Sequence, residues 1–322
     1  MLLICPTFFG YDRAIADAAA AQGYDVTLLD ARAGTGAAYK SALKFFPDLT
    51  RRLTQARLRD RFTGIDDPAG IDQILLVKGD GVTAETIRSL RRRMPRARLT
   101  VYLWDGVRNM PGVVPGLAVA DRVFTFDRND SDAFGWTYLP LFSRAALTDR
   151  PDSTQAPVLW DWSFIGSLHS DRHRVLRAMV AENPGQQYFV HCYVQNTAVK
   201  LIRAVADPGI LSGRPPPLSS QIMGYDRYRE VVAQSRAVVD IEHPSQTGMT
   251  MRTIEALLDG KKLITTNAAV GDSDLYHPSR VAIVDRKAPR VTEEFLASAF
   301  LPVPVAMRQR YHIDGWLRTL LT

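Results

Sequence analysis

The sequence predicts a two-domain α/β protein in which each domain is built on a parallel β-sheet. The chain has 322 residues, a length that suits two domains of ordinary size. Apolar runs of strand length alternate with helical stretches, which is typical of parallel sheets with right-handed crossovers. A polar stretch with two prolines, 148–157, interrupts this alternation and predicts the domain boundary. We expect an N-terminal domain at 1–150 and a C-terminal domain at 158–322, with their sheets facing across a cleft.

The N-terminal half carries the first set of alternating elements. Its predicted strands are 2–9, 24–30, 72–79, 97–105, 120–127 and 136–142. Its predicted helices are 12–23, 83–94 and a short one at 129–135. Thr83 is the expected N-cap of the second helix, because a threonine hydroxyl can accept from a free N–H of the first turn.

The alternation restarts in the C-terminal half. Predicted strands lie at 160–167, 186–194, 236–242, 262–267 and 280–285. Predicted helices lie at 171–183, 225–235 and 250–259, and a further helical region begins at Val291. Ligands of open parallel sheets bind beyond the carboxyl ends of the strands, so the turns after the strands are the places to look for a site.

Composition fits a soluble globular protein, with 46% hydrophobic and 23% charged residues and a net charge of +6. No apolar run reaches the roughly 18 to 20 residues that span a bilayer. The N-terminus lacks the basic region of a signal peptide and reads as a strand, so we expect a cytoplasmic protein. Cys5 and Cys192 lie in separate apolar stretches and are expected to be buried, reduced thiols.

The turn and helix at 242–267 form the strongest candidate site. Gly248 allows a ligand to approach the backbone, and the helix that follows favours an anion at its N-terminus. Arg252 could donate to phosphate oxygens, and Glu255 could accept from two ribose hydroxyls. The predicted binding residues here are Gln246, Thr247, Gly248, Thr250, Arg252 and Glu255. The structural alternative is that Thr247 or Thr250 is a plain N-cap and that Arg252 and Glu255 form a local ion pair.

The turn at 163–179 is the second candidate. A strand runs into Gly166 and Ser167, and the next helix begins with several basic residues, among them Arg172. Cations at a helix start oppose the helix dipole, so a bound anion would explain them, whereas solvated surface cations are the alternative. His169 and His173 have no third metal ligand nearby, and no metal site is predicted.

The N-terminal half offers weaker candidates. Gly10 and Asp12 follow the first strand without the further glycines of a dinucleotide-binding fingerprint, and they are predicted substrate-binding residues. Asp80 and Asp105 follow later strands. A carboxylate in such a place could act as a general base, and Asp105 is preferred because Trp104 offers an apolar wall. The alternative is that each carboxylate caps a turn.

Three segments resemble a known family. GMTMRTIEALLDGKKLITTN at 248–267 is similar to the G-x-x-x-R-x-x-E-x-x-x-x-G pattern of CgeB-like and related GT-B glycosyltransferases of bacterial surface-polysaccharide synthesis, such as lipopolysaccharide and capsule. DWSFIGSLHSDRHRVL at 161–176 and YLWDGVRN at 102–109 resemble further segments of that group. The resemblance implies two Rossmann-like domains, no obligatory metal or other cofactor, and a nucleotide-sugar donor bound mostly by the C-terminal domain.

Carried over to this sequence, the resemblance assigns roles to matching residues. Glu255 would bind the ribose, Arg252 and the Gly248 turn would lie at the diphosphate, and Gly166 and Arg172 would lie on the other side of the donor. Thr247 stands where many related enzymes have a second glutamate, so the resemblance assigns neither a retaining mechanism nor a firm base.

The resemblance also implies partners. The acceptor would be a saccharide or a lipid-linked molecule, reached at the inner face of the membrane. The segment 40–61 is rich in basic residues and could rest on anionic lipid, although an ordinary basic helix surface is the alternative. The apolar residues of this segment that would meet the lipid are Leu43, Phe45, Phe46, Leu49 and Leu53.

Two function classes other than a transferase are compatible with parts of the sequence. A non-catalytic protein that binds a small molecule or nucleotide between two α/β domains is the main alternative to a transferase. A nucleic-acid-binding protein is suggested by the basic clusters, but the sequence has no RNA-recognition or helix-turn-helix signature, and no nucleic-acid partner is expected.

Overall fold

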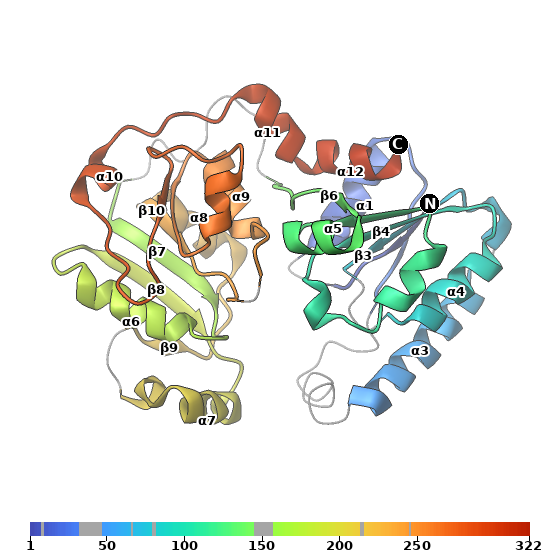
Figure 1. Cartoon of the computed structure of the whole chain (residues 1–322), viewed down its shortest axis with the longest axis horizontal. Helices are drawn as coiled ribbons and strands as arrows, with labels where there is room; N and C mark the ends of the chain where they lie inside the picture. The colour runs from blue at the N-terminus through green and yellow to red at the C-terminus, as the bar shows by residue number, and fades with distance from the viewer. Residues whose placement is uncertain are drawn as a thin grey trace. The chain divides into compact units, whose positions relative to one another are not determined.

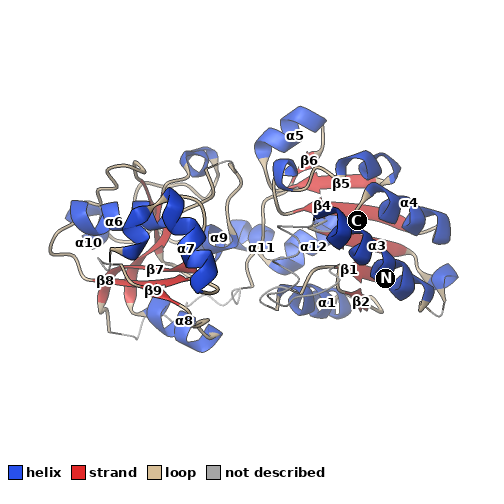
Figure 2. Cartoon of the chain, turned by 90° about the horizontal axis from the view of Figure 1, so that it is seen from below, coloured by secondary structure: helices blue, strands red, loops and turns tan. Residues whose placement is uncertain are grey.

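A computed structural model describes residues 1–7, 10–31, 47–65, 67–78, 82–144, 157–212, 216–244 and 246–322. The chain divides into two compact units (Figure 1). Unit 1 comprises Met1–Arg144 and Arg310–Thr322, and unit 2 comprises Ala145–Gln309. Each unit holds a six-stranded parallel sheet, which confirms the predicted fold class of two α/β domains with parallel sheets. Figure 2 shows these sheets in red with helices packed around them.

The sheet of unit 1 has the order β2-β1-β3-β4-β5-β6. Its strands are β1 (Leu2–Ile4), β2 (Thr27–Leu29), β3 (Gln73–Val77), β4 (Arg98–Leu103), β5 (Arg122–Thr125) and β6 (Thr137–Tyr138). The main helices are α1 (Tyr11–Ala21), α3 (Pro47–Thr63), α4 (Ala84–Arg93), α5 (Arg128–Phe134) and α12 (Ile313–Leu321). Thr83 caps α4 by accepting from the backbone N–H of Thr86, as its sequence predicts.

Alternation along β4 divides its side chains between two helical layers. Leu99 and Val101 join the core that also contains Leu58 of α3 and Ile87 of α4. On the opposite face, the ring of Tyr102 meets the ring of Trp316 edge-on at 4.9 Å. Successive strand residues point to opposite faces, so this strand needs apolar cover on both sides.

Helix α12 corrects the predicted domain boundary. The sequence placed everything up to Thr322 in the C-terminal domain, whereas Arg310–Thr322 belongs to unit 1. The reason is the apolar stripe of α12, in which Trp316, Leu317 and Leu320 are buried against the unit 1 sheet. An amphipathic stripe shows that a helix packs on a sheet but does not show which sheet, so the sequence could not assign it.

The sheet of unit 2 has the order β12-β11-β10-β7-β8-β9. Its strands are β7 (Trp160–Ser167), β8 (Tyr188–Tyr193), β9 (Leu218–Ser219), β10 (Ser235–Asp240), β11 (Lys262–Thr265) and β12 (Val281–Ile283). The helices are α6 (Arg172–Glu182), α7 (Thr197–Ala206), α8 (Tyr225–Ala233), α9 (Met251–Leu258), α10 (Glu293–Ala297) and α11 (Val305–Tyr311), the last of which ends in unit 1.

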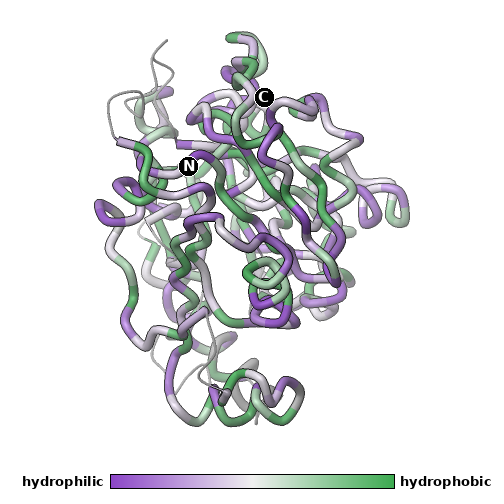
Figure 3. The backbone as a smooth tube through the Cα atoms, turned by 90° about the vertical axis from the view of Figure 1, so that its left-hand side faces the viewer, coloured by the Kyte–Doolittle hydropathy of each residue, from purple (hydrophilic) through white to green (hydrophobic). Residues whose placement is uncertain are grey.

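Helices cover both faces of this sheet as well. On one face, Val175 and Met179 of α6 pack with Trp162 and Phe164 of β7. On the other face, a smaller cluster joins α8 and α9 to β10. Figure 3 colours the chain by hydropathy, and its helical segments carry both green and purple, as amphipathic helices do.

Strand order locates a switch point in each sheet. In unit 2 the chain moves from β7 to β8 and β9 on one side, and then returns to β10, β11 and β12 on the other. The switch point therefore lies between the neighbouring strands β7 and β10. In unit 1 it lies between β1 and β3. Open α/β sheets bind ligands at the carboxyl ends of strands at such points.

The remaining predictions from composition have mixed outcomes. Cys5 and Cys192 are buried and are not joined in a disulfide, as predicted. Among the described residues, no helix is long and apolar enough to cross a bilayer. Asp80 and the first part of the basic segment, residues 40–46, lie outside the described residues. Pro47 begins α3, where a proline is tolerated at the first helical position.

Candidate functional site

The candidate site of unit 2 lies at the switch point, where β7 and β10 end side by side. The two strands pair in register, with Val238 opposite Ser163. β7 ends at Gly166 and Ser167, two of the predicted binding residues, and β10 ends at Asp240. The helices α6 and α9 begin after these strand ends, so both predicted turns of the C-terminal half meet at one edge of one sheet.

Asp240 is the centre of this edge. Its side chain is fully buried and accepts from the hydroxyls of Thr250 (2.6 Å) and Thr253 (2.7 Å) and from Nη1 of Arg252 (2.8 Å). Burial alone would raise the pKa of Asp240, but the Arg252 charge and the two hydroxyl donors outweigh burial, so the pKa lies below its ordinary value. Asp240 is therefore a carboxylate that fixes the start of α9 to the end of β10.

Two arginines bracket Gly166. Arg252 donates through Nη2 to the carbonyl of Ile165 at 2.6 Å, and Arg172 donates through Nη1 to the carbonyl of Ser167 at 2.8 Å. Arg172 is only 5% exposed and also donates to the carbonyl of Ile241. A Cβ at Gly166 would lie 3.0 Å from Nη2 of Arg252 and 2.9 Å from the ring of Phe164. The turn therefore needs glycine so that both guanidinium groups can reach the strand ends.

A second ionic bridge ties α6 to the segment after β10. Arg286 donates to Asp171, the N-cap residue of α6, at 2.8 Å and also contacts Glu242. Glu242 further accepts from the hydroxyl of Thr266. Burial raises the pKa of Glu242, and the hydrogen bond from Thr266 only partly offsets this effect.

The side chain of Asn267, which follows β11, holds the loop before α9 in place. Asn267 donates from Nδ2 to the carbonyls of Thr247 (3.1 Å) and Gly248 (3.3 Å). Thr250 is the N-cap of α9 and accepts from the backbone N–H of Thr253. The N-cap of the structural alternative is thus present at Thr250, and Arg252 also forms an ion pair with Asp240 at 2.8 Å.

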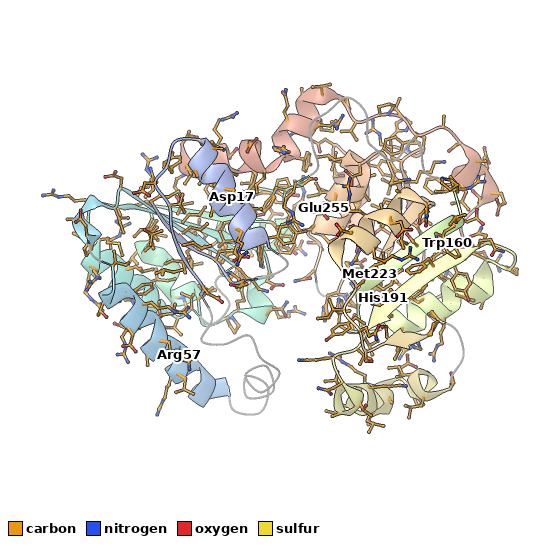
Figure 4. All side chains as sticks on the ribbon, turned by 180° about the vertical axis from the view of Figure 1, so that it is seen from behind. Asp17, Arg57, Trp160, His191, Met223 and Glu255 are labelled. Atoms are coloured by element: carbon orange, nitrogen blue, oxygen red, sulfur yellow. The ribbon has the colours of Figure 1, made fainter. Side chains whose placement is uncertain are left out.

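Gln246, Thr247 and Glu255 complete the predicted set. Gln246 and Thr247 are partly buried in the loop before α9, and Glu255 is partly buried on α9, where Figure 4 labels it. The structure therefore gathers the predicted residues of the C-terminal half around the ends of β7 and β10. Their contacts with a ligand stay predictions.

Basic side chains also lie at this edge. His169 follows β7, and its ring lies 6.0 Å from the ring of His243. Burial lowers the pKa of His169 to about 3, and the charges that lower it further belong to Arg172, His243, Arg252 and Arg203. The shift reflects burial first and neighbouring cations second, so His169 is a neutral ring beside the ion pairs of Arg252 and Arg286.

The candidate site of unit 1 lies after β1. Gly10 has a φ of 74°, a left-handed conformation that glycine adopts without strain, and it is the N-cap of α1. Asp12 in the first turn of α1 is buried, and within the described part of the chain its Oδ1 has no hydrogen-bond partner. A buried carboxylate oxygen normally has a donor, which makes Asp12 a candidate for contact with a ligand.

Asp105 lies at the end of the β4 segment and pairs with Lys78. Oδ2 of Asp105 is 3.2 Å from Nζ of Lys78, and the carboxylate side chain is 29% exposed. Lys78 follows β3 with a φ of 76°, which is unfavourable for a residue with a side chain and which concentrates at functional sites. Trp104 is buried beside Asp105 and contacts Tyr11 edge-on, so the predicted apolar wall is present.

Sequence reasoning missed the residues that organise the site. Asp240, Glu242 and Arg286 were not predicted, although they tie the two turns together. The first two carried a signal, because an acidic residue inside the apolar run RAVVDIE must find a buried partner. The partners of Asp240 lie in the next helix, but Glu242 is bound by Arg286 from a distant segment, and the sequence does not pair such residues.

Comparisons with known proteins identify the fold. No family model and no curated protein matches the chain. Solved structures do resemble it across nearly its whole length. AviGT4, a glycosyltransferase involved in avilamycin A biosynthesis, is 12% identical with a TM-score of 0.59, and the match covers 99% of this chain and 95% of that one. HepE from Anabaena, solved in complex with UDP and glucose, is 11% identical with a TM-score of 0.55, covering 99% and 97%. The chain has the GT-B fold.

The GT-B fold serves more than one reaction. A protein assigned as a UDP-N-acetylglucosamine 2-epimerase from Listeria monocytogenes is 10% identical with a TM-score of 0.53, covering 99% of this chain and 93% of that one. In the described residues of this GT-B chain, no group of three or more His, Cys, Asp or Glu side chains could hold a metal ion. The fold alone does not fix the reaction, which depends on the residues at the switch points.

Proposed function

We propose that the protein transfers a sugar from a nucleotide-sugar donor to a growing surface polysaccharide or a lipid-linked acceptor. The observation that carries the proposal is the edge between β7 and β10, where the N-termini of α6 and α9 meet at a topological switch point. A diphosphate suits this place because backbone N–H groups and helix dipoles favour an anion.

In this proposal the donor is bound by unit 2. The backbone of Gly248 and the start of α9 hold the diphosphate on one side, and Gly166 with Ser167 lies on the other. Arg252 and Arg172 support it through the strand-end carbonyls that they fix and through their charge. Glu255 accepts from the ribose hydroxyls, because a carboxylate can accept two hydrogen bonds at once.

Unit 1 supplies the acceptor side and the base. Asp12 binds an acceptor group through its buried carboxylate, and Asp105 removes the proton of the attacking hydroxyl. Lys78 orients the Asp105 carboxylate through the 3.2 Å ion pair. No metal has a role in this scheme, and each step of it uses groups of the protein alone.

Nucleotide binding is the direct test of the donor site. Thermal shift with UDP, GDP, ADP, dTDP and CMP should give stabilisation by at least one, about 2.7 kcal/mol at a ligand concentration of 100 Kd. Glu255→Ala should then weaken binding of that nucleotide about ten- to hundredfold, the range for hydrogen bonds to a charged group. The exposed Glu294→Ala serves as the control.

A ligand variant assigns the ribose role to Glu255. The 2′,3′-dideoxy form of the nucleotide should bind the native protein weakly and should lose nothing further in Glu255→Ala. A further loss would remove Glu255 from the ribose. If no nucleotide stabilises the protein, the donor site itself is refuted.

Turnover separates the proposal from its alternatives. A transferase releases free nucleoside diphosphate when an acceptor is added. An epimerase changes the sugar while it stays on the nucleotide, and a binding protein without catalysis changes neither. Mass analysis of the nucleotide products distinguishes all three.

A further inference from the structure

Helix α7 of unit 2 exposes its apolar stripe. Leu201, Ile202 and Val205 are 53%, 47% and 87% exposed, and Ala198 is exposed as well. These positions are spaced i, i+3, i+4 and i+7, the spacing that normally faces a core. Another side of the helix packs on the rest of unit 2, where Ala204 is buried. Leu211, just after the helix, extends the exposed apolar surface at 54%.

Such a stripe indicates a binding surface, because soluble proteins seldom leave adjoining large apolar side chains in water. In Figure 3 the segment of α7, at the lower edge of the view, carries green as well as purple. Single exposed apolar residues elsewhere on the protein need no such explanation. Here four exposed residues share one face of one helix.

Charge selects the partner. The helix carries Lys200 and Arg203 and no acidic residue. Between Glu182 and Asp226 the sequence has a single acidic residue, Asp207, and its carboxylate is already bound by Arg177 at 2.8 Å. Two copies of this helix packed together would bring like charges close, which disfavours self-association. An anionic surface would instead attract them.

We propose that α7 docks the protein on anionic lipid membranes, with Leu201, Ile202 and Val205 inserted at the interface and Lys200 and Arg203 near the headgroups. This is the arrangement of an interfacial amphipathic helix. The surface differs from the segment 40–61 that the sequence suggested for the same purpose. It is independent of the reaction, since it requires neither nucleotide nor acceptor.

The position of α7 in unit 2 explains how membrane docking would serve the proposed reaction. Helix α7 begins at Thr197, shortly after β8 ends at Tyr193 beside Ser167 of β7, so the start of α7 follows the same carboxyl edge of the sheet. A membrane bound through α7 would therefore lie near the proposed donor site of the same unit. A lipid-linked acceptor would then be concentrated where the donor is held.

Vesicle binding tests the proposal with matched variants. The full chain is sedimented with phosphatidylcholine vesicles and with vesicles rich in phosphatidylglycerol. We expect the native protein to bind to the anionic vesicles. Binding should be at least about tenfold weaker for Leu201→Gln/Val205→Gln, because two apolar side chains that would insert into the membrane are lost. Leu301→Gln/Val305→Gln changes the same residue types at exposed positions outside α7 and should bind like the native protein.

A charge variant and a spectroscopic probe complete the test. Lys200→Gln/Arg203→Gln should weaken binding to anionic vesicles and reduce its dependence on salt. Ile202→Trp should show a blue-shifted emission when anionic vesicles are added, relative to the native protein. Melting temperatures establish that every variant is folded.

Three outcomes would overturn the proposal. One is no binding to anionic vesicles by the native chain. Another is equal binding by the α7 variant and its Leu301/Val305 control. The third is a concentration-dependent dimer in sedimentation velocity that Val205→Gln dissociates, which would make the stripe a contact between copies.

Discussion

The carboxyl edges of the two sheets differ in how they treat charge. In unit 2, Asp240 and Arg172 are buried and bound to the strand ends and to α9. In unit 1, the ion pair of Asp105 and Lys78 is partly exposed, and the buried Asp12 has an oxygen without a hydrogen-bond partner among the described residues. Removing one partner of a buried pair leaves an uncompensated charge, whereas an exposed pair contributes little to stability. The edge of unit 2 is therefore held by buried charges bound to the strand ends, whereas the edge of unit 1 carries a partly exposed ion pair.

The largest expected effect is on catalysis and concerns Asp105. Asp105→Asn should lower the rate of sugar transfer by about 10²- to 10⁴-fold, the usual contribution of a general base. Its free energy of unfolding should change by no more than about 1 kcal/mol, because the pair is partly exposed. Initial rates and urea unfolding measure the two quantities. Glu85→Gln, at an exposed pair with Arg92, is the control and should change neither.

The next effect is on stability and concerns Asp240. Asp240→Asn leaves Arg252 without its buried counter-ion and should destabilise the protein by about 3–5 kcal/mol. The control is Glu182→Gln, whose partner Arg290 is exposed, and it should cost less than about 1 kcal/mol. Equal costs for the two variants would show that the buried pair of Asp240 and Arg252 stabilises the protein no more than an exposed pair.

A smaller effect is the pH dependence that His169 confers. Its pKa falls from 6.5 in the unfolded chain to about 3 in the folded protein, so the unfolded chain binds the proton more readily. The stability that the neutral ring contributes is complete above pH 6.5 and is lost as the pH falls toward 3, by at most about 1.4 kcal/mol per pH unit. Chemical unfolding between pH 7 and 4 should show a shallower slope for His169→Gln. An unchanged slope would mean that other groups set it.

The smallest effect is expected from removing divalent metal ions, which should leave the rate of sugar transfer unchanged. The proposed transfer uses protein groups alone, so EDTA should leave the initial rate unchanged at saturating donor. Added Mg²⁺ should not raise the rate of the EDTA-treated protein by more than about twofold, since the helix N-termini at the edge of unit 2 favour the diphosphate charge. A rate that depends on the metal would show that the edge needs help in holding the donor.

Local patterns carried most of the fold. The alternation of strands and helices follows from periodicity, and the caps at Thr83 and Thr250 follow from their hydroxyls. The turns at Gly166 and Gly248 could be found because parallel strands place their ligands at carboxyl ends. Contacts between segments that are far apart in the sequence could not be predicted. Asp240 has its arginine in the next helix, but Arg286 reaches Asp171 across 115 residues, and no local pattern encodes such a pair.

Sheet order also lay beyond the sequence. The strand run of unit 2 could be arranged in several ways, and only the observed return of the chain to β10 beside β7 brings the two predicted turns together. The same limit applies to α12. Its burial against unit 1 depends on where the chain leads it, and its stripe would have suited either sheet.

The position of α12 makes unit 1 depend on residues that follow unit 2. Unit 2 is inserted within unit 1, because residues 310–322 complete the core that residues 1–144 begin. A chain truncated after Gln309 keeps all of unit 2 but leaves the sheet of unit 1 without the cover that Trp316 provides. Limited proteolysis of such a chain should therefore show a resistant unit 2 beside a sensitive unit 1.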